Sequence, residues 1–247
     1  MVRRVNPVAI FLVCVLAACS TSGTIDGTEP NISDPFESVN RGVHGVNKGL
    51  DRVILRPASQ VYDVITPDPA ERHIGNATAN LGEPASAVNK LLQGDIGGAL
   101  KATGRFGINT TLGILGLFDP ASQVGLTPDP TDFGETLYKW GVGEGPYVEL
   151  PVLGPATSRG AVGRVVDFVI NPLNTLVPAP ESNYILAARG VEIIDLRKKL
   201  GETVDTILYR SADSYSVARQ SYLDNRRRTL KGALDAEDLD DPFAFDQ

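Results

Sequence analysis

The sequence predicts a mainly α fold in a single domain, and three observations support this. Apolar side chains recur at steps of three and four residues in several stretches, which is the spacing of one helical face. The 17 prolines and 25 glycines among 247 residues divide these stretches, so we expect several helices and not one long coiled coil. Residues 147–152 alternate between apolar and polar side chains and are the only segment that we expect to be extended.

The N-terminus has the organisation of a lipoprotein signal sequence. Two arginines precede the apolar run 8–16, and the sequence LAAC at residues 16–19 resembles the lipobox of bacterial lipoproteins. By this resemblance, residues 1–18 are a cleaved signal peptide and Cys19 is the lipidation site. Several acyl chains anchor a protein firmly, whereas one chain does so only marginally. The alternative is a plain signal peptide followed by a chance cysteine, which the direct succession of charge, apolar run and LAAC disfavours.

The residues after the lipobox predict a tether and a sorting signal. Ser20 follows the lipidated cysteine, and by the bacterial sorting rule a residue other than aspartate there directs a lipoprotein to the outer membrane. Residues 19–33 are rich in Ser, Thr, Gly and Asp, which is typical of a flexible tether. Cys14, the other cysteine of the chain, lies in the removed segment, so the mature protein has no thiol.

The helical segments that we expect follow from apolar spacing, capping residues and breakers. The first helix is opened by Asp34-Pro35 and ends before Pro57, and a short helix runs from the break at 66–69 to about Asn80. A third helix runs from Glu83-Pro84 through Leu92, and a fourth is capped by Asp95 and continues to about Phe118. The later segments are a brief helix at 132–140, a helix from Thr157 or Ser158 through Ile170, a long helix at 186–207 and a last helix after Ser211. We expect one helical domain over residues 34–231 and an acidic, disordered tail over residues 232–247.

Two of these segments show where apolar residues gather. On the first helix one apolar stripe is formed by Val39, Val43, Val46, Leu50 and Val53. In the third helix we expect the following apolar residues to be buried: Val88, Leu91 and Leu92.

Residues 105–121 are the most apolar stretch after the signal sequence and are nearly free of charge. At about 1.5 Å per helical residue the stretch is too short to cross a bilayer of about 30 Å. It is also too apolar on all sides for a helix at a water-facing surface. Two interpretations remain open at this point: a buried core helix, or a segment in lipid whose backbone is protected by neighbouring protein.

The sequence offers no catalytic or metal-binding constellation. The formal charge of −7 argues against nucleic acid as a partner. His44 and His73 lack the spacing to other ligands that a metal site needs, and no Gly-x-Ser-x-Gly elbow is present. The glycines of residues 141–145 fit a tight turn better than a phosphate-binding loop. We therefore expect no enzyme activity, no metal and no cofactor.

A series of ordered motifs resembles the MlaA (VacJ) family of outer-membrane lipoproteins. The motifs are DPFESVNR at 34–41, NLGEP at 80–84, VNKLLQG at 88–94, RFGINT at 105–110, GILGLFD at 113–119, FGETL at 133–137, WGVGEGPY at 140–147 and LPVLGP at 150–155. One departure is Gly160, which stands where the family usually has an aspartate after the arginine. The consequence of that replacement is open at the level of sequence.

The resemblance implies a fold and a function. The fold is a ring-shaped, multi-helix single domain around an amphipathic central channel, lying on the periplasmic face of the outer membrane. The function is removal of mislocalised phospholipids from the outer leaflet and their transfer to a soluble periplasmic carrier for retrograde transport, with a trimeric porin as a further partner. Two alternatives are a porin-associated scaffold that transports nothing and a lipid-anchored esterase.

The resemblance also implies site residues. The gating hairpin of the family maps to a turn-rich segment that contains Asp119, Pro120, Gly125, Pro128 and Phe133. The candidates for channel-lining or lipid-facing residues are Asn47, Lys48, Asn80, Asn89, Asn109, Leu112, Leu115 and Phe118. For each asparagine, a capping or inter-helix hydrogen bond is an equally good interpretation.

Overall fold

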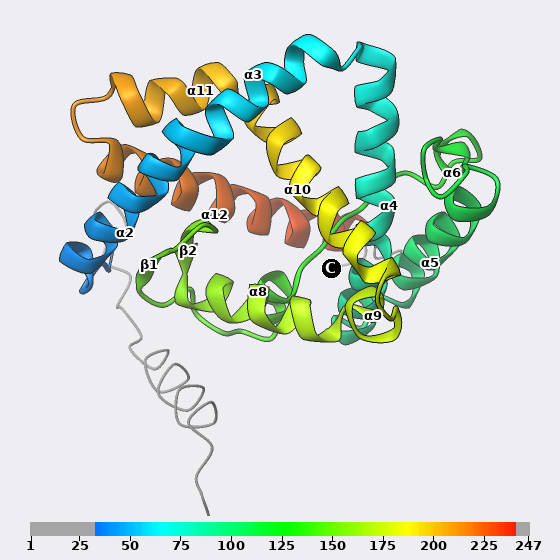
Figure 1. The fold of residues 1–247 in the computed structure, drawn as a ribbon. Helices are drawn as coiled ribbons and strands as arrows, with labels where there is room; N and C mark the ends of the chain where they lie inside the picture. Colours follow the sequence, from blue (N-terminus) through cyan, green and yellow to red (C-terminus); the bar gives the residue numbers. More distant parts are fainter. Residues whose placement is uncertain (1–32, 241–247) are drawn as a thin grey trace, which may run out of the picture.

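The computed structural model describes residues 33–240, apart from the side chains of Thr175 and of residues 233–240. This part of the chain is mainly helical, which confirms the predicted fold class. Figure 1 shows α2, α3 and α4 following one another along the left, top and right of the molecule, α8 and α9 along the bottom, and α10 and α12 between them. The signal peptide, Cys19 and the tether up to residue 32 lie outside the described residues.

The first helical segment continues past the proline at which we expected it to end. It consists of α2 (Glu37–Leu50), the π-helical turn η2 (Asp51–Leu55) and α3 (Arg56–Ile65). Within the wider turn, the Arg56 amide donates to the carbonyl of Asp51, five residues back. The proline at position 57 lies in the first turn of α3, where a missing N–H costs little. The π turn therefore leads directly into α3, a helix that we did not expect from the sequence.

The predicted break in the middle of α4 is also wrong. α4 (Asp68–Leu92) is one 25-residue helix with Pro84 in its interior. A proline inside a helix costs about 3 kcal/mol because it removes a hydrogen bond and crowds the preceding turn. Here α4 runs alongside α5 (Ile96–Thr111) for much of its length, and the two helices share a buried ion pair. Tertiary contact therefore overrides the local breaker.

α5 begins as predicted and ends earlier than predicted. The Asp95 carboxylate caps its first turn by accepting from the Gly98 amide at 2.6 Å. The helix ends at Thr111, and residues 112–118 form a succession of turns instead of continuing it. Ile114 and Leu115 have φ angles of 54° and 58°, in the left-handed region that a helix of L-residues does not use. The most apolar segment is thus a loop.

The turn-rich segment after this loop carries two short helices. α6 (Pro120–Gln123) is capped by Asp119, and α7 (Phe133–Lys139) is capped by Asp132, whose carboxylate accepts from the Glu135 amide at 2.8 Å. The extended segment is present as β1 (Tyr147–Leu150). It pairs antiparallel with β2 (Gly154–Thr157), which the sequence analysis did not expect. β2 contains a glycine and a proline and lacks the alternation that marks a strand.

The second half of the chain returns across the molecule. Its elements are α8 (Ser158–Ile170), α9 (Pro172–Leu176), α10 (Glu181–Lys199), α11 (Gly201–Asp205), the π-helical turn η3 (Thr206–Arg210) and α12 (Ser214–Asp240). Thr157 caps α8 as predicted, because its hydroxyl accepts from the Gly160 amide at 3.1 Å. α9 lies within a segment that we expected to be a loop. α12 begins after the predicted break at Ser211 and runs to Asp240, which lies within the segment 232–247 that we expected to be a tail.

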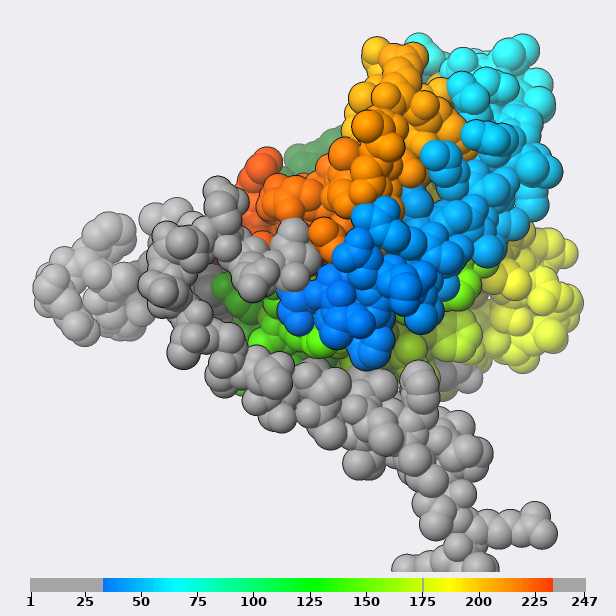
Figure 2. All heavy atoms as spheres, turned by 90° about the vertical axis from the view of Figure 1, so that its left-hand side faces the viewer, coloured from blue at the N-terminus to red at the C-terminus, as the bar shows by residue number. Residues whose placement is uncertain are grey.

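Ion pairs join the first helices to the last third of the chain. Arg197 on α10 binds Asp51 through both Nε and Nη2, at 2.6 and 3.1 Å, and both side chains are buried. Arg56 at the start of α3 donates to Asp205 on α11 at 2.7 Å. Figure 2 shows from the side that the blue start of the described chain lies against the orange residues of α11 and η3. These pairs fix α2 and α3 to the end of the chain.

Candidate lipid-contacting surface and polar interior

The described residues are distributed in the reverse of the usual pattern for a water-soluble protein. Twenty-one polar or charged residues are buried, whereas only eight apolar residues are. The small apolar core lies around Tyr147, Tyr215 and Leu223. Charged side chains are almost never fully buried unless they are paired, and large exposed apolar patches mark sites of contact with membranes or proteins.

α4 shows the reversal most directly. Leu91 and Leu92, which we expected to be buried, are exposed, and that prediction is wrong. The buried positions of the same helix are polar: Thr78, Asn80, Glu83, Ser86, Asn89 and Lys90. The apolar stripe of α2 also points outward, since Val39 and Val46 are exposed while Asn40 and His44 are buried. The helical periodicity is correct in both helices, but the apolar face is the outer one.

The loop at 112–118 forms part of this apolar exterior. Leu112 and Leu115 are 75% and 73% exposed, and Ile114, Leu117 and Phe118 are exposed as well. The interpretation of this segment as a buried core helix is therefore wrong. A β-branched residue at positive φ, such as Ile114, is a strained conformation of the kind that clusters at functional sites. The backbone is held from α4, because Asn76 Nδ2 donates to the Leu117 carbonyl and His73 Nδ1 lies 3.0 Å from it.

The base of the turn-rich segment is held by a buried polar cluster. Asn109 Nδ2 donates to Asp119 at 2.9 Å, and Asn109 Oδ1 accepts from the buried Ala121 amide at 3.0 Å. Arg105 pairs with Glu83 at 2.5 Å and lies 3.4 Å from Asp119. Burial by itself would raise the pKa of Asp119, but hydrogen bonds from Ser122 and Asn109 and the charge of Arg105 outweigh it and lower that pKa.

The far end of the same segment is held by α4 and α8. Asn89, which is 0% exposed, donates to Asp167 at 2.7 Å and accepts from the Thr136 hydroxyl at 3.0 Å. Both oxygens of Asp167 accept from the Phe133 amide. Burial raises the pKa of Asp167, and the hydrogen bonds from Asn89 and Phe133 oppose that rise. Asp119 and Asp167 therefore fix the two ends of the segment that we expected to be a gating hairpin.

Within that segment, the predicted residues differ in their surroundings. Pro120 opens α6 directly after its cap, and Gly125 adopts a φ of 89° after α6 ends. Pro128 is exposed, and the neighbouring Asp129 binds the buried Lys90 at 2.6 Å. The Phe133 ring meets Trp140 edge-on with centroids 5.7 Å apart. Movement of this segment as a gate stays a prediction.

The remaining polar candidates also join elements. Asn47 donates to Glu149 and to the Leu150 carbonyl, and it accepts from the Val152 amide, so its amide holds α2 to the β1–β2 hairpin. Lys48 Nζ donates to Ser214 at 3.3 Å. Asn80 donates to Thr110, and its buried Oδ1 has no hydrogen-bond partner among the described residues. The inter-helix interpretation is thus confirmed for Asn80 and Asn89, and Asn109 bonds at the cap of α6, whereas Asn47 bonds to a hairpin and not to a helix. Contact of any of them with a channel stays a prediction.

The structure also brings together three side chains that the sequence analysis did not associate. His44 Nε2 lies 3.1 Å from Ser214 Oγ, and His44 Nδ1 lies 3.5 Å from Glu149 Oε1. This order resembles the nucleophile, base and orienting acid of a hydrolase. However, Lys48 also donates to the Ser214 hydroxyl, and Glu149 already accepts from Asn47 and Tyr147. Two pockets among the described residues are lined by other side chains.

Neither metal binding nor membrane crossing is indicated within the described residues. No group of three His, Cys, Asp or Glu side chains is arranged to hold a metal ion there. In the same part of the chain, no helix combines the length and apolarity that crossing a bilayer requires. The fold and its side chains therefore define a class: a mainly helical protein with an apolar exterior and a polar, ion-paired interior.

The chain belongs to the MlaA lipoprotein family, whose model matches residues 32–229. It is 36% identical over 213 residues to the intermembrane phospholipid transport system lipoprotein MlaA of Escherichia coli K12, covering 84% of this chain and 81% of that protein. The Haemophilus influenzae protein of the same name is 30% identical over 223 residues, covering 87% and 88% of the two chains. An uncharacterized protein of Rickettsia bellii is 34% identical over 210 residues, covering 85% and 81%.

A solved structure shares the fold. It was described in a study of the structural basis for maintenance of bacterial outer membrane lipid asymmetry. The match has a TM-score of 0.65 and 36% sequence identity, and it covers 80% of this chain and 99% of the other. Sequence and structure comparisons therefore agree on the family.

Proposed function

We propose that this protein removes mislocalised phospholipids from the outer leaflet of the outer membrane and passes them to a soluble periplasmic carrier, which maintains lipid asymmetry. Family membership supports this, since relatives are named as lipoproteins of an intermembrane phospholipid transport system. The observation that carries the proposal is the reversed distribution of side chains, with apolar residues outside and polar residues buried.

The physical argument concerns the two parts of a phospholipid. Moving its charged head group through hydrocarbon costs free energy, whereas its apolar acyl chains are stable in hydrocarbon. A body that is apolar outside and polar inside lets the tails stay in lipid while the head moves along polar groups. We propose that the helices enclose an amphipathic channel for the head, and that the segment between Asp119 and Phe133 gates it. Its two ends are fixed by buried carboxylates, while the exposed turn at Gly125 and Pro128 lies between them.

The location and partners are part of the same proposal. Acylation at Cys19 would anchor the chain to the periplasmic face of the outer membrane, with the apolar loop 112–118 seated in one leaflet. A trimeric porin would supply the surrounding surface, and a soluble carrier would receive the lipid. A body that enters one leaflet needs less apolar length than one that crosses both, which fits the short apolar loop.

Transfer of labelled phospholipid tests the proposal. Outer-membrane vesicles that contain the protein and a trimeric porin are mixed with the soluble carrier, and labelled lipid in the carrier fraction is measured. We expect transfer that depends on this protein. Porin binding without lipid transfer would favour the scaffold, and release of fatty acid would favour the esterase. In cells, deletion of the gene should raise phospholipid exposed at the cell surface, and an unchanged surface would argue against transport.

A further inference from the structure

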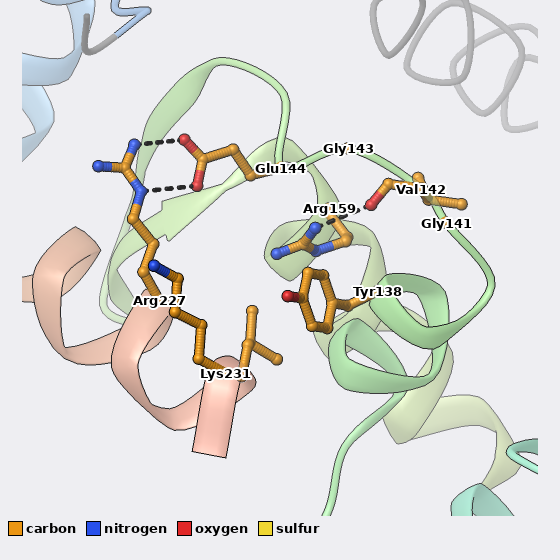
Figure 3. A pocket seen from close by; sticks show the side chains of 9 residues that line it. Tyr138, Gly141, Val142, Gly143, Glu144, Arg159, Arg227 and Lys231 are labelled. Atoms are coloured by element: carbon orange, nitrogen blue, oxygen red, sulfur yellow. Dashed lines mark hydrogen bonds and ion pairs between the residues drawn. The ribbon is translucent and has the colours of Figure 1, made fainter. Parts of the chain in front are cut away.

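A second feature of the fold is a pocket of about 280 Å³ on the side of α8 that faces α12. The end of α7, the glycine-rich turn at 141–144, the start of α8 and residues 227–231 of α12 form its walls (Figure 3). The lining residues are Tyr138, Gly141, Val142, Gly143, Glu144, Arg159, Arg227, Leu230 and Lys231. None of them is among the channel-lining, lipid-facing or hairpin residues that we expected from the sequence.

Arg159 is the central cation of this pocket. Arg159 is only 5% exposed. Its Nη1 donates to the Val142 carbonyl at 2.8 Å, and its guanidinium lies 5.0 Å from the centre of the Tyr138 ring. No described carboxylate lies within ion-pair distance of it. Burial lowers the pKa of Arg159, and the charge of Glu144 offsets this only in part. A buried charge that lacks a counter-charge is costly, so this position favours an anion from outside the chain.

The other charges of the lining leave the pocket positive. Arg227 donates to both oxygens of Glu144, which neutralises that pair. Lys231 is exposed and has no carboxylate partner among the described residues. Figure 3 shows that Arg159 and Lys231 approach the pocket from α8 and from α12. Two cations that lack a carboxylate partner among the described residues therefore line opposite sides of one pocket, in a protein whose formal charge is −7.

We propose that this pocket binds a phosphate group through Arg159 and Lys231. A guanidinium presents a fork of donors that matches phosphate oxygens, and a lysine adds a mobile point charge. The turn opposite them has little bulk, since a Cβ on Gly141 or Gly143 would meet no atom within 4 Å. The volume accommodates a head group and not a pair of acyl chains. We assign the phosphate to a phospholipid head group because of the proposed function. The preference of the pocket for a phosphate group rests on its charges and does not depend on that function.

Titration calorimetry of the full-length acylated protein in an uncharged detergent tests the site. The probes are inorganic phosphate, glycerophosphoglycerol as a soluble phosphodiester head group, and phosphatidylcholine vesicles with and without phosphatidylglycerol. Because charge-assisted hydrogen bonds are worth about 1.5–3 kcal/mol, we expect Lys231→Glu to weaken phosphate or head-group binding about tenfold or more. Arg159→Lys, which keeps the charge and loses the fork, should weaken binding too.

The matched control is Arg228→Glu, the same reversal of charge on an exposed neighbour that does not line the pocket. It should change binding by no more than about twofold, because exposed charges act weakly on each other through water. If the protein binds the head group and the phosphatidylglycerol vesicles, and Lys231→Glu loses this binding, the phosphate comes from a lipid. If the protein binds inorganic phosphate alone, the site takes a soluble phosphate. Equal effects of the two reversals, or no binding of any probe, would overturn the site. Lipid transfer by the unaltered protein is measured separately, so failure of the transport proposal is seen independently.

Discussion

Gly116 lies directly against Asn80, so close that a Cβ on residue 116 would fall 2.6 Å from the Asn80 Cβ. Its φ of 91° is a second reason for glycine at this position. The backbone of the apolar loop therefore touches α4 at Gly116, where it contacts the buried Asn80 side chain.

Gly116→Ala should lower the stability of the loop, because the methyl group both strains the backbone and collides with Asn80. Each effect costs about 1–2 kcal/mol, and thermal unfolding in detergent measures the sum. Gly107→Ala on α5 is the control, since nothing lies within 4 Å of a Cβ there. That change should be neutral or stabilise the helix by up to about 1 kcal/mol. Equal unfolding temperatures for the two variants would contradict the contact.

Leu115→Asp should impair lipid transport by weakening the seating of the apolar loop in lipid. The side chain is 73% exposed at a φ of 58°, a conformation that aspartate adopts more readily than leucine. The change therefore removes apolarity without adding backbone strain. Transport is followed as lipid transfer to the carrier, and Ser221→Asp, on an exposed position of α12, serves as the control. Unchanged transfer by Leu115→Asp would mean that this residue does not contact lipid.

Asn109→Leu should loosen the base of the turn-rich segment. The substitution keeps the approximate size of the side chain but leaves the buried Ala121 amide without its acceptor and removes one of the donors to Asp119. An unsatisfied buried group costs about 1–3 kcal/mol, which should appear as faster proteolysis within residues 120–131 and a lower unfolding temperature. Asn76→Leu is a milder comparison, because the Leu117 carbonyl retains His73. The prediction fails if Asn109→Leu is no more sensitive than Asn76→Leu.

Glu135→Gln should stabilise the protein at neutral pH by about 1 kcal/mol. Burial raises the pKa of Glu135, which is 6% exposed, above its ordinary value of 4.5. The folded state thus holds the proton to higher pH than the unfolded state, and wild-type stability falls as pH rises through that window. The difference in the free energy of unfolding between the variant and the wild type is largest above the folded-state pKa and disappears below about pH 4.5. Denaturant titrations across this range measure it, with the exposed Glu202→Gln as control; a difference independent of pH would contradict the argument.

Ser214→Ala distinguishes transport from hydrolysis. If the Ser214–His44–Glu149 arrangement were a nucleophilic site, loss of the hydroxyl would abolish fatty-acid release. We expect lipid transfer to be unchanged and no fatty acid to be released by either protein. Mass spectrometry of the lipids after incubation measures both quantities. Release of fatty acid by the unaltered chain that disappears in Ser214→Ala would establish the esterase instead.

Local signals in the sequence were sufficient where the structure is local. Asp95, Asp132 and Thr157 cap the helices that follow them, because a capping side chain needs only the amides of the next turn. The breakers at Pro57 and Pro84 misled, since a π turn in one case and the contact between α4 and α5 in the other absorb the proline. The apolar spacing of a sequence does not show which helix will pack against a proline or where a π turn will form.

The candidate site was predictable in composition but not in arrangement. The stripe on α2 and the leucines of α4 have helical spacing, yet that spacing does not tell which side is core and which is exterior. The Asp51–Arg197 pair joins residues 146 positions apart and has no local signature. The same holds for the pocket around Arg159, which three separate parts of the chain create.

The sequence by itself determined the family, the helical class and the caps at Asp95, Asp132 and Thr157, and it predicts lipidation at Cys19, because each depends on residues adjacent in the chain. The tertiary structure alone decided that residues 112–118 are a strained, exposed loop and that polar side chains fill the interior. The physical reason is that burial and ion pairing belong to helices brought together from distant positions. Which face of an amphipathic helix points inward is settled only by what surrounds it.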